Sequence, residues 1–111
     1  MSRELRVGIL GVGTVGSAVT RLLVENEEII TARAGRRIIP VLGAVKNLNE
    51  SPNAPIPLTT NVDEILDDPS IDIVCELMGG IDFAFACIKK ALEHGKAVVT
   101  ANKAVLAYHR F

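Results

Sequence analysis

The sequence has few of the residues that mark metal-binding, disulfide-bonded or nucleic-acid-binding proteins. It contains no tryptophan, one tyrosine and two cysteines, Cys75 and Cys87, whose spacing fits no metal-ligand motif. Its 12 basic and 13 acidic residues are spread along the chain and give a net charge of −1, so no basic stripe favours nucleic acid. These absences predict a cytoplasmic protein in a reducing compartment, with no metal site and no nucleic-acid partner.

Long hydrophobic runs are missing as well. The apolar part of the amino-terminal segment MSRELRVGIL is too short for a signal peptide or a membrane span, and Gly11 interrupts it. The 111 residues are enough for one domain, which we expect to span residues 1–111. Hydrophobic residues nevertheless make up 49% of the chain, which predicts strands buried on both faces or apolar surface left for a partner.

What the sequence does contain is an alternation of strand-like and helix-like segments. Short apolar runs predict strands at Leu5–Leu10, Ile38–Val45, Ile71–Leu77 and Ala97–Thr100. Helical periodicity is present from Thr14 to near Gly35, from Asn61 to about Leu66, and from Asp82 to Gly95. This order predicts an α/β, Rossmann-like fold with a doubly wound, mostly parallel sheet in three αβα layers.

The ends of these helices carry recognisable signals. Asn61 and Glu64 have the spacing of a capping box, and Asp82 stands where it could cap the following helix. Gly35 and Gly95 are expected to end helices. Residues 46–57 hold three of the five prolines, which predicts an irregular surface loop.

A glycine motif follows the first predicted strand. Gly11, Gly13 and Gly16 match G-x-G-x-x-G and stand between a strand and an amphipathic helix, as dinucleotide binding requires. Gly11 permits a tight turn, Gly13 lets backbone approach a pyrophosphate, and Gly16 lets helix and strand pack closely. No Gly-Lys-Ser/Thr follows, which argues against a nucleoside-triphosphatase loop. The alternative is a glycine-rich turn that holds no ligand.

The end of the second predicted strand bears on the choice of cofactor. An Asp or Glu usually binds the ribose there, but the sequence reads Gly43-Ala44-Val45-Lys46-Asn47, and no carboxylate occurs before Glu50. Lys46 would attract the extra 2′-phosphate of NADP, so we expect NADP or NAD, with NADP favoured. The alternative is that Lys46 is a solvated loop lysine.

Three stretches together indicate a family. GILGVGTVGSAVTRLL, IDIVCELMGG and GKAVVTANKAVLA resemble the N-terminal NAD(P)-binding domain of homoserine dehydrogenase, over about Leu5 to Ala107. The resemblance implies NAD(P)-dependent interconversion of L-homoserine and L-aspartate 4-semialdehyde, in threonine and methionine biosynthesis. It also implies a catalytic role for Lys103 in proton transfer. The cofactor-binding residues that it implies are Gly11, Gly13, Thr14, Val15, Gly16, Lys46, Met78, Gly79, Gly80, Thr100, Asn102 and Lys103.

The resemblance also implies what the chain lacks. The substrate-binding and dimerisation region of the family would follow Phe111, so we expect a domain truncated before it. Such a chain would bind dinucleotide without turning over homoserine, and the full-length enzyme would be a homo-oligomer. The alternatives are the cofactor domain of another two-domain NAD(P) oxidoreductase and a non-catalytic NAD(P)-sensing module.

Other reactive side chains are assigned structural roles. Cys75 and Cys87 are expected to be buried structural cysteines rather than nucleophiles. Glu76, near the carboxyl end of its strand, is expected to make a supporting hydrogen bond near the site rather than to act in catalysis. His94, His109 and the Asp67-Asp68 pair are expected at the surface.

Overall fold

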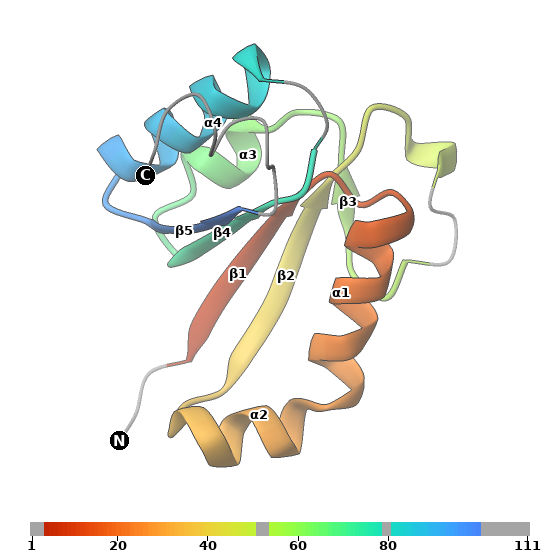
Figure 1. The fold of residues 1–111 in the computed structure, drawn as a ribbon, viewed down its shortest axis with the longest axis vertical. Helices are drawn as coiled ribbons and strands as arrows, with labels where there is room; N and C mark the ends of the chain where they lie inside the picture. Colours follow the sequence, from red (N-terminus) through yellow and green to blue (C-terminus); the bar gives the residue numbers. More distant parts are fainter. Residues whose placement is uncertain (1–3, 51–53, 79–80, 101–111) are drawn as a thin grey trace.

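The computed structural model describes residues 4–50, 54–78 and 81–100, and these residues form a sandwich around a five-stranded sheet (Figure 1). The strands are β1 (Leu5–Leu10), β2 (Ile38–Ala44), β3 (Leu58–Thr59), β4 (Ile73–Glu76) and β5 (Ala97–Thr100). They pair in the order β3-β2-β1-β4-β5, and every pair is parallel. The sheet therefore extends from β1 in both directions, which confirms the doubly wound prediction.

Helices cover both faces of this sheet. The helices α1 (Thr14–Glu25) and α2 (Glu27–Ala34) lie on one face, and α3 (Asp63–Leu66) and α4 (Asp82–Glu93) lie on the other (Figure 1). A short 3-10 turn, Leu48–Glu50, lies in the connection between β2 and β3. The three αβα layers agree with the fold expected from the sequence.

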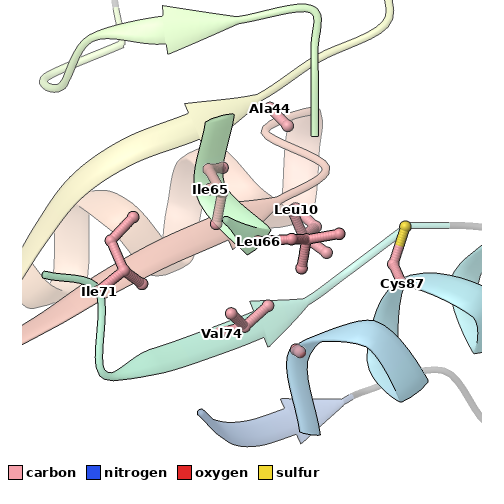
Figure 2. Packing of buried hydrophobic residues seen from close by; sticks show 8 residues of the cluster. Leu10, Ala44, Ile65, Leu66, Ile71, Val74 and Cys87 are labelled. Atoms are coloured by element: carbon pink, nitrogen blue, oxygen red, sulfur yellow. The ribbon is translucent and has the colours of Figure 1, made fainter. Parts of the chain in front are cut away.

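The central strand β1 contributes to a hydrophobic core on each face. Leu10 packs in one cluster with side chains that include Ile65, Leu66 and Val74 (Figure 2). Val7 and Ile9 belong to a second cluster on the other side of the sheet. Because both faces of β1 are covered, this strand shows no alternation of apolar and polar residues.

The long first helix of the prediction is two helices in the structure. The backbone N–H and the Nδ2 of Asn26 both lie 3.0 Å from the carbonyl oxygen of Leu22, to which they donate, and α1 ends there. The eight residues of α2, all within the described part of the chain, include no buried residue. Gly35, with φ +75°, ends α2 as expected.

Several boundaries also differ from the prediction. The two-residue strand β3 was not predicted, β2 ends at Ala44, and β4 is shorter than the expected Ile71–Leu77. Asp82 is the first residue of α4 and its side chain makes no capping bond, so the prediction that it caps this helix was wrong. The Oδ1 of Asn61 accepts the N–H of Asp63 at 3.0 Å, but Glu64 accepts the hydroxyl of Thr59 instead of completing a capping box.

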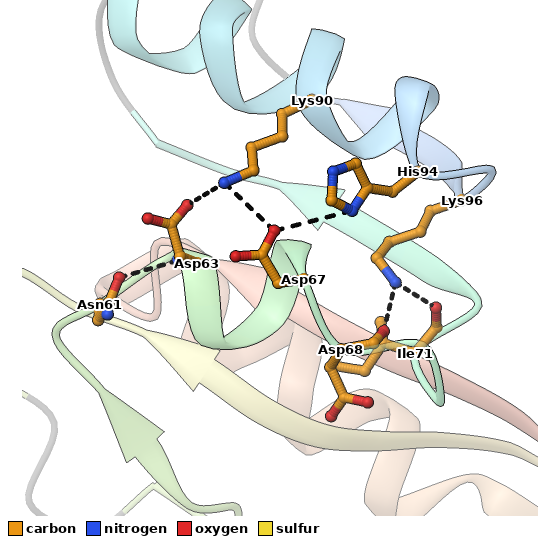
Figure 3. Close-up of polar contacts among 8 residues, drawn as sticks. All are labelled: Asn61, Asp63, Asp67, Asp68, Ile71, Lys90, His94 and Lys96. Carbon is orange, nitrogen blue, oxygen red and sulfur yellow. Dashed lines mark hydrogen bonds and ion pairs between the residues drawn. The ribbon is translucent and has the colours of Figure 1, made fainter.

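Polar contacts join α3 to α4, and the segment after α3 to Lys96, just before β5 (Figure 3). The Lys90 ammonium lies 2.6 Å from the carboxylate of Asp63 and 3.2 Å from that of Asp67. Its hydrogen bond to Asp63 is the largest cause of its raised pKa, and its hydrogen bond to Asp67 is the next largest. The Nδ1 of His94 is 3.7 Å from the same Asp67 carboxylate. Asp67 and His94 are exposed, as expected, whereas Asp68 is half-buried. Asp67 and His94 form part of a network between the two helices.

Candidate dinucleotide site

A cleft of ≈ 880 Å³ opens at the carboxyl ends of the strands. It lies where the strand order reverses beside β1, which is the position at which doubly wound sheets bind their ligands. The residues that line it come from the end of β2, from the loops after four strands and from two helices: Gly11, Gly13, Gly16, Ala44, Val45, Lys46, Thr60, Asn61, Val62, Leu77, Met78 and Phe83. The glycine motif thus lies at the edge of the sheet where the sequence placed it.

Two of the glycines in the motif are required by their surroundings. Gly11 has φ +94°, and a Cβ built on it would lie 3.0 Å from both the backbone N and the Cγ of Met78. A Cβ on Gly16 would overlap the carbonyl oxygen of Gly11. The tight turn at Gly11 and the close approach at Gly16 are therefore both present.

The loop between these glycines is fixed by backbone hydrogen bonds, and Gly13 within it is exposed to solvent. The backbone N–H groups of Gly11 and Val12 both donate to the carbonyl oxygen of Ala44, at 2.9 and 3.1 Å. Gly13 is exposed, and a Cβ on it would meet no described atom within 4 Å. Gly13 also stands at the N-cap of α1, where no side chain of the described residues caps the helix. The first-turn N–H groups of a helix lack intrahelical acceptors and attract anions, so this arrangement fits a pyrophosphate.

The β2 side of the cleft carries Lys46 and the segment after β3. Lys46 is exposed and comes two residues after the end of β2. Thr60, Asn61 and Val62 also line the cleft, and the sequence reasoning missed them as site residues. They follow β3, which pairs with β2 over two residues, Leu58 and Thr59. A strand this short leaves no periodicity in the sequence, so the loop after it carried no visible signal.

The β4 side of the cleft is formed by Leu77, Met78 and Phe83. Phe83, in the first turn of α4, is 61% exposed, and the sequence reasoning assigned it no role. The sequence signal that could have identified Phe83 is an aromatic residue shortly after Gly79 and Gly80. Glu76 is fully buried beneath this side and makes hydrogen bonds with its neighbours, as the sequence reasoning expected.

The structure describes only some of the expected site residues. Gly79, Gly80, Asn102 and Lys103 lie outside the described residues, as does His109. Thr14 and Val15 begin α1, but their side chains are not described. Thr100 is the last residue of β5. The structure therefore brings together Gly11, Gly13, Gly16, Lys46 and Met78 around one cleft, and the part of the site near Lys103 stays a prediction.

Both cysteines have the properties of structural residues. Cys75 in β4 is partly buried, Cys87 in α4 is buried, and both are free thiols. Burial is the largest cause of the raised pKa of each thiol, which disfavours the reactive thiolate. Among the residues that the structure describes, no three His, Cys, Asp or Glu side chains are grouped to hold a metal ion.

No helix in the described part of the chain combines the length and the apolar character that crossing a membrane requires.

Comparison with known proteins identifies the family of the chain. Residues 11–110 match the family model of the homoserine dehydrogenase NAD-binding domain. Homoserine dehydrogenase from Helicobacter pylori is 43% identical to the chain over 111 residues, and that from Methylobacillus glycogenes is 44% identical over 108. These matches cover 100% and 95% of the chain and 26% of each relative.

A solved structure gives the same result in three dimensions. The crystal structure of a homoserine dehydrogenase from Thiobacillus denitrificans superposes with a TM-score of 0.93 and 45% identity. The superposition covers 97% of the chain and 26% of that structure, so the chain spans about a quarter of the length of the relatives it matches. The family match extends over nearly all of the sequence, from residue 11 to residue 110. The chain therefore belongs to the homoserine dehydrogenase family and corresponds to its NAD-binding domain.

Proposed function

We propose that the cleft binds NADP or NAD, with the pyrophosphate over the Gly11–Gly16 loop. The observation that carries this proposal is the exposed Gly13 at the start of α1, which no side chain of the described residues caps, next to a loop fixed by two hydrogen bonds to Ala44. The adenosine half would lie toward β2 and β3 and the nicotinamide half toward β4 and β5, because the ribose-binding position of such folds follows β2. When bound, the nicotinamide ring would supply hydride transfer.

The preference for NADP depends on Lys46. This exposed ammonium lines the cleft after β2, where a carboxylate would repel a 2′-phosphate and a cation attracts it. We therefore propose that NADP binds more tightly than NAD, most clearly at low ionic strength, where the charge of Lys46 is screened least.

The proposed reaction is the interconversion of L-homoserine and L-aspartate 4-semialdehyde. In the oxidation, the carbinol carbon would lose a hydride and its hydroxyl a proton, which would leave a carbon–oxygen double bond. Acceptance of the hydride is the chemistry that the bound nicotinamide would supply. We assign the proton to Lys103, whose amine accepts it in this direction and returns it in reduction. An amine acts in this way near neutrality when burial or a neighbouring cation lowers its pKa.

The substrate itself needs more than the described residues. The chain spans 26% of its relatives, and we propose that substrate binding and assembly into a homo-oligomer belong to the remainder of the full-length protein. The chain alone would then bind cofactor without oxidising homoserine. We also propose that it works in the cytoplasm, where the free thiols of Cys75 and Cys87 stay reduced.

Titration of the 111-residue chain with NADPH and NADH, followed by nicotinamide fluorescence, tests the proposal. We expect saturable binding of both, tighter for NADPH at low salt, and no reduction of NADP⁺ when homoserine is added. A folded chain that binds neither dinucleotide would overturn the binding site. Tighter binding of NADH would overturn the NADP preference alone, and homoserine oxidation would overturn the proposed need for the remaining chain.

A further inference from the structure

A buried carboxylate lies beneath the β4 side of the cleft. Glu76 is the last residue of β4 and is 0% exposed. Its Oε2 accepts the backbone N–H of Met78 at 2.7 Å, and its Oε1 accepts the hydroxyl of Thr100 at 2.6 Å. Thr100 is the residue paired with Glu76 in the register of β4 and β5. One side chain thus joins the turn after β4 to the end of β5.

The bonding pattern suits a carboxylate better than any other side chain of its size. A polar group at such depth is costly unless it is hydrogen-bonded, and both oxygens of Glu76 have a donor. A glutamine has the same shape but offers one acceptor and one donor, so the hydroxyl of Thr100 would have to turn and accept from the amide, and both hydrogen bonds would lose the charge of the carboxylate.

The contact with Met78 extends to the glycine loop. The backbone N of Met78 is one of the atoms that a Cβ on Gly11 would meet at 3.0 Å, so the turn after β4 packs directly on this loop. The N–H of Leu77 donates to the carbonyl oxygen of Leu10 at 2.9 Å, which fixes the same turn to the end of β1. On the other side, Thr100 directly precedes Ala101, Asn102 and Lys103 in the sequence.

We propose that Glu76 is a positioning residue for the nicotinamide half of the dinucleotide. Its carboxylate fixes the Leu77–Met78 turn against the end of β5, and through this turn it sets the β4 side of the cleft relative to the glycine loop. The adenosine half, toward β2 and β3, is outside its reach. This inference rests on the proposed dinucleotide site.

The test compares whole and half cofactors on the 111-residue chain and its Glu76→Gln variant. The probes are NADPH and 2′,5′-ADP, or NADH and ADP if the unaltered chain prefers NADH. We expect the Glu76→Gln variant to bind the whole dinucleotide about tenfold more weakly, with the affinity for the adenosine fragment unchanged. At saturation, the fluorescence enhancement of the reduced nicotinamide should also be smaller, because this signal reports the surroundings of the ring itself.

Two further variants separate positioning from general damage to the fold. Thr100→Val removes one of the two donors without changing Glu76, and we expect a smaller loss of the same selective kind. Asp72→Asn is the matched control, because the Oδ2 of Asp72 accepts the N–H of Arg6 at 2.9 Å just before β4, at the opposite end of that strand. It should leave the affinity for both ligands unchanged.

The outcomes distinguish this inference from the proposal on which it rests. Failure of the folded, unaltered chain to bind any dinucleotide would overturn both. If the unaltered chain binds the dinucleotide and the Glu76→Gln variant binds it equally well, only the role of Glu76 is overturned. The same holds if the variant loses affinity for the whole dinucleotide and for the adenosine fragment to the same extent. If Glu76→Gln does not fold, Thr100→Val decides, and an unchanged or unselective affinity there overturns the proposal.

Discussion

Gly16 approaches the carbonyl oxygen of Gly11 so closely that a methyl group on Gly16 would overlap that oxygen. A Gly16→Ala substitution must therefore move α1 away from the end of β1. We expect a loss of about 1–3 kcal/mol in the free energy of unfolding, measured by urea denaturation. Gly13→Ala is the control, because its Cβ would meet no described atom within 4 Å and stability should change little.

Removal of the Lys46 charge should change the choice of cofactor. In a Lys46→Ala variant, we expect the affinity for NADPH to fall about tenfold and that for NADH to change little, because NADPH alone carries the 2′-phosphate. Fluorescence titration at two salt concentrations measures both. Lys89→Ala removes an exposed lysine of α4 that does not line the cleft and should leave the ratio unchanged. An unchanged ratio in Lys46→Ala would mean that Lys46 does not contact the phosphate.

Of the two roles that the resemblance implies for Lys103, proton transfer is the one whose loss should affect turnover far more than cofactor binding. The measurement needs a longer protein that joins this domain to the substrate region of the family. There we expect Lys103→Ala to lower kcat by about 100-fold or more while the Kd for NADPH stays the same. Unchanged turnover would remove Lys103 from the mechanism. Loss of NADPH affinity would assign it to cofactor binding instead.

Protonation of the Asp68 carboxylate at low pH should lower the stability of the fold. The hydroxyl of Ser70 donates to the Asp68 carboxylate at 2.7 Å, and the backbone N–H of Ser70 donates to it at 2.8 Å. Both hydrogen bonds lower the pKa of Asp68 below its ordinary value, the hydroxyl more than the N–H. The stabilisation is therefore present above the ordinary pKa and is lost as the pH falls through the lowered pKa. Ser70→Ala should reduce this loss, measured as a smaller fall in Tm on acidification. A fall equal to that of the unaltered chain would show that the hydroxyl does not contribute.

The buried ammonium of Lys96 holds the segment between α3 and β4. Lys96 is 5% exposed, and its Nζ donates to the carbonyl oxygens of Asp68 and Ile71, the latter at 2.8 Å (Figure 3). Methionine fills a similar volume but donates no hydrogen bond, so Lys96→Met would leave these carbonyls without that donor. We expect a loss of about 1–3 kcal/mol in the free energy of unfolding, measured in urea. Lys89→Met on the exposed face of α4 should cost far less.

The sequence predicted best those features that depend on local pattern. The bounds of β1 and β5, the start of α1 at Thr14 and the ends of α2 and α4 near Gly35 and Gly95 follow from periodicity and glycine signals. The position of the glycine loop also followed, because a doubly wound sheet places the loops after its strands at one edge.

Features decided by specific pairings or hydrogen bonds, rather than by an apolar period, were missed. β3 exists because Leu58 and Thr59 pair with Gly43 and Ala44, and two residues show no period of their own. Glu64 could have completed a capping box, but the hydroxyl of Thr59 offered it a different partner. Asn26 ends α1 through bonds to Leu22 that a stripe of apolar residues does not reveal. Each of these outcomes was decided by a competing contact rather than by the local propensity.

The hydrogen bonds from Gly11 and Val12 to Ala44 have a consequence for the thermodynamics of binding. A loop that is mobile before binding loses conformational entropy when a ligand orders it, and this loss lowers the affinity. Here the turn is tied to the neighbouring strand and lies against Met78, so most of its freedom is lost when the sheet forms. The proposed phosphate-binding loop is thus preorganised by folding, and little of its entropy remains to oppose the arrival of a cofactor.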